Sequence, residues 1–336
     1  MRHLVIILLA LAIVSCTSKW QPSDSINNGH DFLCNAGICD DSLTLSSNDL
    51  RFDNDGENWP HLILDLATCQ AIGLDKMIGV DTNSVVVRVW GIQDYPDKGI
   101  TLLLGQATDD LRTCWLATYG KNGMIDFMCL GECGGLNKLY WDDPDEHTRL
   151  RGIDSMRLVL PDKFGKPMQL SRWISYNEER DGVETDSTLW FIHHELPVTI
   201  GKNGNFTIGK IGTVYSADTT VLNNYWRSKR QLEVFSWTPL SDTTVYDRLN
   251  TFLEGAKGTI TEPKQLLGDF GMLVDGFFYR DTERFMRWCC EHPDSQLTKG
   301  MVIHYKEVGL EWLSIQLKRI KDPQLQQQAK QLWGLK

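Results

Sequence analysis

The chain has 336 residues and a formal net charge of −10 at pH 7. This length accommodates two domains, because a single domain usually holds about 100–200 residues. An acidic chain without clustered basic residues repels a nucleic-acid backbone, so we exclude nucleic acid as a partner.

The N-terminus begins MRHLVIILLALAIVSC, with a basic start and an unbroken apolar run from Leu4 to Val14. That run is too short to span a membrane as a stable helix, and the small residue Ser15 after it is typical of the cleavage site of an export signal. The sequence therefore predicts a signal peptide over residues 1–15 and an exported protein.

Ile13-Val14-Ser15-Cys16 resembles the lipobox of bacterial lipoproteins. The resemblance implies that the Cys16 thiol receives a diacylglyceryl group, that the peptide is cut before Cys16, and that the new N-terminus is acylated, typically with palmitate. Several acyl chains give a durable membrane anchor, which one chain does not. Thr17 favours the outer membrane of the cell envelope by likeness to the enteric sorting rule. An ordinary secretory signal or a short anchor helix is the alternative interpretation.

Eight cysteines follow Cys16, and an even number outside the cytosol predicts disulfides. The candidates for disulfide bonding are Cys34, Cys39, Cys114, Cys129 and Cys133. Cys34 and Cys39 would close a small loop. Zinc is the competing use of Cys129 with Cys133 and of Cys289-Cys290 with His292, but these spacings lack the short pairs of a zinc ribbon. We therefore predict no metal and no cofactor.

Residues 17–50 are rich in Ser, Asn and Asp and show little periodicity. This composition predicts a flexible, lipid-anchored tether over residues 16–50 that lifts the folded part off the membrane. The segment WPHLILDLATCQAIGL from Trp59 is ambiguous between helix and strand.

From Arg51 onward, runs of branched and aromatic residues bounded by Gly, Asn, Asp and Pro predict antiparallel strands. These runs begin at Ser84, Gly99, Leu111, Met124, Ser155, Pro167, Thr188, Asn205 and Arg230. We group them into two meander-like β units, residues 51–150 and 151–240.

The pattern Thr-x-Gly-Lys-Asn-Gly occurs twice, from Thr118 and from Thr199. It lacks the spacing of a phosphate loop, whereas Gly and Asn between alternating runs predict a hairpin turn. A turn centred on Lys121 and Asn122 would place Cys114 opposite Cys129, within reach of a disulfide. A bond between Cys129 and Cys133 is equally well supported.

After Thr243 the apolar spacing lengthens to that of helices. In VYDRLNTFLEGA, the residues Val245, Leu249 and Phe252 share one face, and similar patterns occur over 281–292, 308–320 and 323–335. Pro323 is well placed to open the last helix. The sequence thus predicts an α+β fold, mainly antiparallel β followed by a helical C-terminal region over 241–336.

His193-His194-Glu195 matches the start of the zinc-protease signature, but its fifth position is Val198. Neighbours on a strand point to opposite faces, so the two histidines are not expected to bind one ion. Acidic residues gather at Asp53–Glu57 and Asp142–His147, where calcium binding and a solvated loop remain alternatives. Six tryptophans in strand or helix patterns are expected in the core: Trp90, Trp115, Trp190, Trp237, Trp288 and Trp312.

The lipobox, tether and β-rich order resemble surface or periplasmic lipoproteins of Bacteroidetes-type bacteria. This resemblance is specific only over residues 1–16 and transfers no site, so we assign no catalytic residue. The first hypothesis is a non-enzymatic envelope lipoprotein, held to the membrane by its lipid, that binds a glycan, peptide or protein or plays a structural part.

The alternative hypothesis is a lipid-anchored hydrolase of cell-wall or dietary polymers. It requires two or more acidic or imidazole groups to converge in one pocket. The candidate groups are Asp142, Asp143, Asp145, Glu146, His147, His193 and Glu195.

Overall fold

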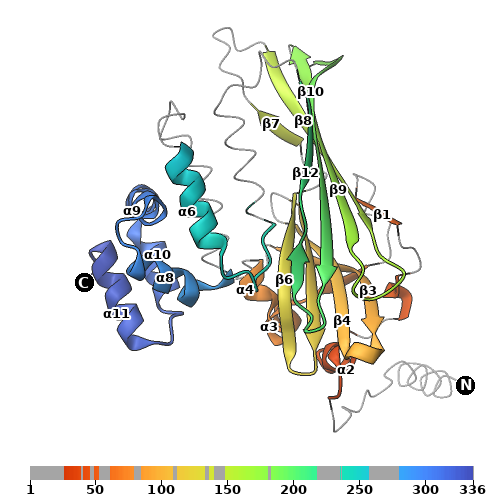
Figure 1. Cartoon of the computed structure of the whole chain (residues 1–336), viewed down its shortest axis with the longest axis horizontal. Coiled ribbons are helices and arrows are strands. Elements are labelled where there is room, and N and C mark those ends of the chain that lie inside the picture. The colour runs from red at the N-terminus through yellow and green to blue at the C-terminus, as the bar shows by residue number, and fades with distance from the viewer. Residues whose placement is uncertain are drawn as a thin grey trace, which may run out of the picture.

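The computed structural model describes residues 26–38, 41–45, 49–52, 61–78, 85–108, 112–132, 136–139, 148–180, 183–217, 235, 237–256 and 280–335. The signal peptide and Cys16 lie outside these ranges, as do the two acidic stretches and most of the strand expected from Arg230. The described part is an α+β protein of antiparallel strands followed by helices, which confirms the predicted fold class (Figure 1). None of the helices within the described ranges has the length and apolar character needed to cross a membrane.

The first sheet is a five-stranded antiparallel meander. Its strands, in spatial and chain order, are β2 (Leu62–Leu64), β3 (Val86–Tyr95), β4 (Ile100–Thr108), β5 (Arg112–Gly120) and β6 (Gly123–Glu132). Side chains alternate between its two faces: Leu102 and Leu104 belong to one buried cluster, whereas Leu103 belongs to another. Both faces of this sheet are therefore covered.

The second sheet is built on three long strands, β8 (Thr148–Val159), β9 (Met168–Arg180) and β10 (Val183–Ile200). Two short strands pair with β8 and two others pair with β10. The strands β1 (Asp49–Phe52) and β7 (Leu136–Leu139) pair with opposite ends of β8, and β11 (Phe206–Ile208) and β12 (Gly212–Ala217) pair with successive parts of β10.

The two sheets pack face to face around one apolar core. This inter-sheet core combines residues of the first sheet, such as Leu116 and Met128, with residues of the second, such as Leu158, Leu170 and Leu196. The predicted core tryptophans with described side chains, Trp90, Trp115, Trp237 and Trp288, are all buried. The hydrophobic effect across this shared core holds the two β units in one sandwich.

Short helices cover the outer face of the five-stranded sheet. They are α2 (Gly29–Asn35), η1 (Asp41–Leu43), α3 (Leu66–Ile72) and α4 (Leu74–Met77). The prediction of a flexible tether is wrong for residues 29–38 and 41–43, because Leu33, Ile38 and Leu43 are each only 1% exposed and pack on this sheet. The ambiguous segment after Trp59 contains both a strand, β2, and a helix, α3. The strand gives way to the helix at Asp65, whose side chain caps α3 by accepting a 2.7 Å bond from Thr68 N.

Both copies of Thr-x-Gly-Lys-Asn-Gly form hairpin turns, as predicted, between β5 and β6 and between β10 and β11. The two hairpins contact each other: Thr118 Oγ1 donates to Gly204 O at 2.7 Å. Gly204 lies so close to Ile125 that an added Cβ would meet its Cδ1 at 2.6 Å. The repeated turns therefore lie side by side at one end of the sandwich.

The predicted pairing of Cys114 with Cys129 is wrong. Next to the turn Tyr119 pairs with Met124, as expected, but Thr118 pairs with Asp126, so one residue is extra on β6. This β-bulge and a second register shift place Cys129 opposite Trp115 and Cys114 opposite Gly131. The two thiols then lie on opposite faces of the sheet, in separate cores.

The bulge brings Asp126 beside Thr118, where its carboxylate joins three segments. Oδ1 accepts from the backbone N–H groups of Phe127 and Ser241, both at 2.9 Å. Oδ2 accepts from Phe206 N at 2.7 Å and from the Ser241 hydroxyl at 2.6 Å. Asp126 is fully buried, so it links β6, the start of β11 and the segment that leads to the C-terminal helices.

The C-terminal helices form a bundle beside the sandwich (Figure 1). They are α6 (Val245–Ala256), α8 (Thr282–Glu291), α9 (Gln296–Val308), α10 (Leu310–Leu317) and α11 (Pro323–Trp333), which confirms the predicted helical region and the role of Pro323 as an opening residue. They enclose an apolar core of their own.

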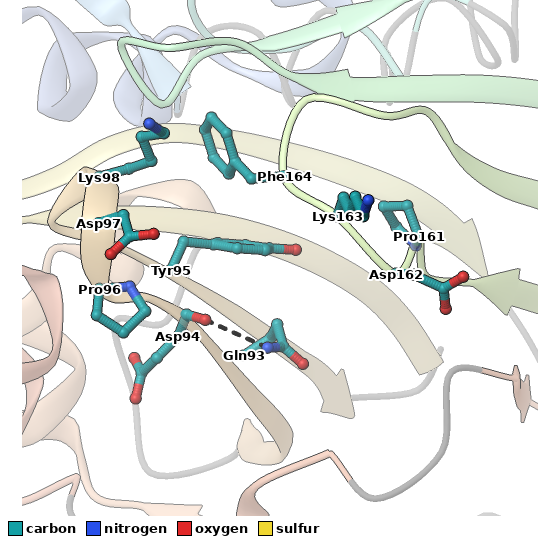
Figure 2. Close-up of a pocket in the computed structure, with 10 residues that line it drawn as sticks. All are labelled: Gln93, Asp94, Tyr95, Pro96, Asp97, Lys98, Pro161, Asp162, Lys163 and Phe164. Carbon is teal, nitrogen blue, oxygen red and sulfur yellow. Dashed lines mark hydrogen bonds between the residues drawn. The ribbon is translucent and has the colours of Figure 1, made fainter.

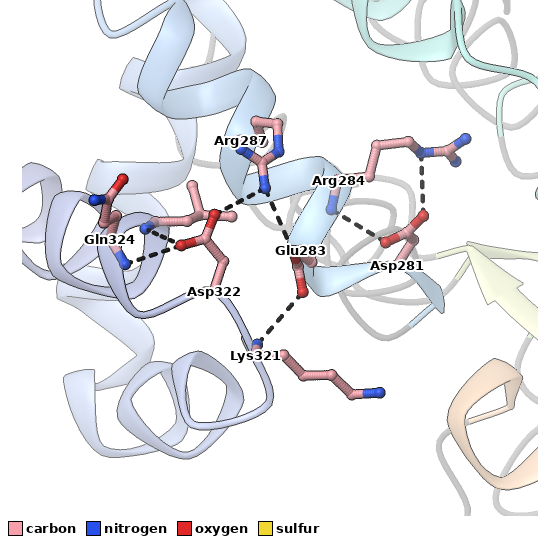
Figure 3. A network of polar contacts seen from close by, with 8 residues as sticks. Asp281, Glu283, Arg284, Arg287, Lys321, Asp322 and Gln324 are labelled. Atoms are coloured by element: carbon pink, nitrogen blue, oxygen red, sulfur yellow. Dashed lines mark hydrogen bonds and ion pairs between the residues drawn. The ribbon is translucent and has the colours of Figure 1, made fainter.

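A polar network ties the start of α11 to α8 (Figure 3). Asp322 caps α11 and lies 3.2 Å from Arg287 Nη2, and Glu283 accepts from the backbone N–H of Lys321 at 3.4 Å. Hydrogen bonding from Leu325 N and from Arg287 lowers the pKa of Asp322. This network is explained by helix capping and packing, so we assign it a structural role.

Candidate functional site

The His-His-Glu group lies on β10, where the strand separates its members as predicted. His193 and Glu195 share the outer face, with 3.6 Å between Nε2 and Oε1, and His193 stacks on Trp173 at 4.9 Å between ring centroids. His194 points into the sandwich, where its Nδ1 lies 3.0 Å from Thr213 Oγ1. The other five candidate groups of the hydrolase hypothesis, Asp142, Asp143, Asp145, Glu146 and His147, lie outside the described residues.

His194 belongs to a buried polar cluster near the end of the inter-sheet core. Its ring meets Trp237 edge to face at 5.2 Å, and the Arg172 guanidinium lies 5.5 Å from the same indole. An added Cβ on Gly131 would come within 2.7 Å of Arg172, so the cluster leaves no space there. This close packing between β6, β9 and β10 indicates a structural cluster.

The described cysteines divide into one bonded and five free residues. Cys34 is disulfide-bonded, and its expected partner Cys39 lies outside the described ranges, so that pairing stays a prediction. The free thiols are Cys69, Cys114, Cys129, Cys289 and Cys290. The predicted disulfides of Cys114 and Cys129 are therefore wrong, including a bond from Cys129 to Cys133.

Burial makes two of the free thiols poor metal ligands or nucleophiles. It raises the pKa of Cys69 to about 11 and that of Cys289 to about 12, and the thiolate is the reactive and metal-binding form. Across the described ranges, no three His, Cys, Asp or Glu side chains lie close enough together to share a metal ion.

A cleft of about 500 Å³ opens between two turns that come from different sheets (Figure 2). One wall is the end of β3 with the 3-10 turn η3 (Pro96–Lys98). The other is the turn between β8 and β9, residues 161–164. The lining residues are Gln93, Asp94, Tyr95, Pro96, Asp97, Lys98, Pro161, Asp162, Lys163 and Phe164.

The chain forms both walls for local reasons. Pro96 presets the backbone at the start of η3, and Gly99 ends it with φ of 65°. In the other turn, Gly165 has φ of 78°, again a conformation that favours glycine. β4 follows the first turn at Ile100 and β9 follows the second at Met168, and the buried residues of these strands fix the walls relative to the inter-sheet core.

Two aromatic rings from opposite walls meet inside the cleft. Tyr95 and Phe164 pack edge to face, with 5.0 Å between centroids and 66° between ring planes. Both side chains are half-buried, and both pack against the inter-sheet core. Burial raises the pKa of Tyr95, so its hydroxyl stays neutral at physiological pH. In Figure 2 that hydroxyl points from the η3 wall toward the turn that carries Pro161.

Polar groups surround the aromatic pair. Asp94 is engaged on both oxygens, because Oδ1 accepts from Thr101 Oγ1 at 2.6 Å and Oδ2 lies 2.9 Å from His30 Nδ1 on α2. Gln93 Nε2 donates to Asp94 O at 3.2 Å, which orients the amide. Asp97 and Lys98 are exposed on their wall. The described lining contains no His, Cys or Ser side chain.

A repeated tripeptide in the sequence marks both walls of this cleft, although the strand pattern does not single it out. The tripeptide Pro-Asp-Lys occurs at residues 96–98 and again at 161–163. An aromatic residue adjoins each copy, Tyr95 before the first and Phe164 after the second. Each copy is a turn signal by itself, but only the packing of the two sheets brings them together.

Comparison with protein-family models, with curated proteins and with solved structures found no match to this chain.

Proposed function

We propose that the chain is a lipid-anchored protein of the cell envelope that binds a ligand without transforming it, and that the cleft of Tyr95 and Phe164 is its binding site. The cleft carries this proposal. Ligand sites are concave, about 300–1,000 Å³ in size, and combine aromatic side chains with a few polar groups. A volume of about 500 Å³ and the mixed lining fit that description.

Binding is favoured over hydrolysis by the state of the carboxylates. Asp94 already holds Thr101 and His30, so it is not poised to exchange a proton with a substrate. Asp97 and Asp162 also line the cleft, but both side chains are exposed and lack the burial with which enzymes prepare a catalytic acid. His193 and Glu195 lie on the outer face of β10, outside the lining of the cleft. The location in the envelope rests on the N-terminal sequence, in which Cys16 follows an export signal.

Hydrogen–deuterium exchange on the full mature chain tests this function. The chain is incubated separately with solubilised envelope polysaccharide and with a proteolytic peptide pool. We expect one pool to protect residues 93–98 and 161–164, because a bound ligand shields both walls. The variant Tyr95→Ala should lose the protection. The variant Ile63→Ala, which removes an apolar side chain that is 58% exposed on β2, is the matched control and should keep it.

Protection that survives in Tyr95→Ala, or protection confined to other segments, would contradict the assignment of the site. Phe164→Ala supplies a second test from the opposite wall. It guards against a Tyr95 variant that fails to fold, and circular dichroism checks both variants.

A further inference from the structure

The two walls of the cleft carry the same short sequence and face each other across the ligand space. Each wall presents Pro, Asp and Lys in that order, one from η3 and one from the turn between β8 and β9. Figure 2 shows Asp97 and Lys98 on one side of Tyr95 and Asp162 and Lys163 on the other. The cleft is therefore lined by two like turns contributed by two different sheets.

This arrangement places both signs of charge on each wall. Asp97 precedes Lys98 and Asp162 precedes Lys163, and all four of these side chains are exposed. Asp94 adds a carboxylate, but His30 and Thr101 hold it from the side of α2 and β4. A site for an anion or a cation concentrates one sign of charge. The cleft instead offers both signs, with three carboxylates and two lysine ammonium groups beside a neutral tyrosine hydroxyl.

The aromatic pair supplies the apolar part of the recognition. Tyr95 and Phe164 meet edge to face, and both rings are half-exposed within the cleft. Such rings offer apolar faces, with a hydroxyl at the edge of Tyr95. Gln93 and the carboxylates of Asp97 and Asp162 are planar groups that accept or donate hydrogen bonds. Ring faces between planar polar groups suit a ligand with apolar C–H faces and a rim of hydroxyls.

We infer that the ligand of this cleft is a neutral saccharide, which stacks on Tyr95 and bonds through its hydroxyls to Gln93, Asp97 and Asp162. The inference rests on the proposed function, because it names the ligand class of the same site. A proline-rich peptide and a charged polymer are the competing occupants. Neither accounts for the mixed charge on both walls together with the planar polar rim.

Isothermal titration of the full mature chain tests the ligand class. The probes are neutral oligosaccharides of glucose, N-acetylglucosamine and mannose, an oligogalacturonate as the anionic saccharide, and a proline-rich peptide. We expect a neutral oligosaccharide to bind and Tyr95→Ala to weaken it about tenfold or more. Tyr95→Phe keeps the ring and should weaken binding less. Ile63→Ala should leave binding unchanged.

The salt dependence of binding and variants that remove a charge distinguish a neutral saccharide from a charged ligand. Binding of a neutral ligand should change by less than about twofold between low and high salt, because no ion pair is screened. Asp97→Asn and Asp162→Asn should each retain binding within about threefold, since an amide still bonds to hydroxyls.

Binding of only the oligogalacturonate or the peptide, with loss in Tyr95→Ala, would overturn the inference of a neutral saccharide and leave the proposed function standing. If no probe binds in a Tyr95-dependent way while the exchange experiment shows a protected cleft, the saccharide inference fails alone. If the exchange experiment also fails, the proposed function falls with it.

Discussion

Replacement of Asp126 by Asn should destabilise the fold although the two side chains have nearly the same shape. The amide keeps one carbonyl oxygen, which can still accept from Phe127 N and Ser241 N in place of Oδ1. Its NH₂ group then takes the place of Oδ2, where Phe206 N donates at 2.7 Å. Two donors face each other there, and the Phe206 N–H loses its acceptor in a buried site. The opposite amide orientation is worse, because it leaves two backbone donors unpaired.

The size of the effect follows from these bonds. A buried donor without an acceptor costs about 1–3 kcal/mol, and the bonds that remain lose the extra strength that a charged acceptor gives. We therefore expect Asp126→Asn to lower the free energy of unfolding by about 2–4 kcal/mol. The Ser241 hydroxyl limits the loss, since it can rotate and accept from the new NH₂ group.

Urea denaturation followed by circular dichroism measures this difference. Asp294→Asn is the matched control, because its side chain is 97% exposed and it makes only a 3.5 Å ion pair with Lys299. The control should stay within about 0.5 kcal/mol of the parent chain. A value for Asp126→Asn that is as small as the control would refute the assignment of Asp126 as the junction of three segments.

The contribution of Asp126 to the free energy of unfolding should decrease as the pH rises. Burial outweighs the hydrogen bonds and raises the pKa of Asp126 in the folded chain, above its ordinary value of about 3.9. The folded state then binds this proton more tightly, so the stabilisation is fully present below the unfolded pKa and is lost as pH rises through the folded pKa. Protonated Asp126 keeps all four bonds, because its Oδ2 hydroxyl donates to Ser241 Oγ and still accepts from Phe206 N, whereas the NH₂ group of Asn cannot accept. The stability gap between the parent and Asp126→Asn should therefore be widest in acid and should narrow toward neutral pH.

Three further predictions concern other parts of the chain. Cys16→Ala should abolish labelling by radioactive palmitate and leave the precursor uncut, whereas normal labelling would exclude the lipobox. Gly29→Ala should lower the free energy of unfolding by about 1–3 kcal/mol, because its Cβ would lie 2.2 Å from a carbonyl oxygen of β5. The control Gly255→Ala, whose Cβ meets nothing within 4 Å, should be neutral or stabilising. Equal effects of the two variants in urea denaturation would refute the close packing of α2 against β5. Cys114 and Cys129 should react with iodoacetamide once the chain is unfolded, even when no reductant is present. If mass spectrometry shows that they react only after a reductant is added, they form a disulfide.

The sequence predicted the elements more accurately than their junctions. The positions of the turns and helices follow from local signals such as Gly-Lys-Asn-Gly and Pro323, and these predictions are confirmed. The partner of Cys129 was mispredicted because the bulge at Ile125 depends on Asp126 reaching Phe206 and Ser241, which are distant in sequence. A pairing rule drawn from one hairpin cannot contain that constraint.

Contacts between residues that are distant in sequence also explain why the N-terminal segment and the cleft were not predicted correctly. Leu33, Ile38 and Leu43 are too widely spaced for a periodic pattern, so composition alone suggested a tether, yet each finds a place on the five-stranded sheet. The candidate cleft needs Tyr95 and Phe164 on facing turns of two sheets. Only the packing of those sheets places the two turns opposite each other.

Photo-cross-linking in the intact envelope tests the central claim most directly. A photoreactive phenylalanine analogue replaces Lys98 at the cleft or, as the control, Asp294, which is 97% exposed on the helical region. We predict an ultraviolet-dependent, glycan-containing adduct from position 98 that is lost when Tyr95→Ala is added, and none from position 294. Equal adducts from both positions, or an adduct at 98 that does not depend on Tyr95, would contradict the assignment of the cleft as the binding site.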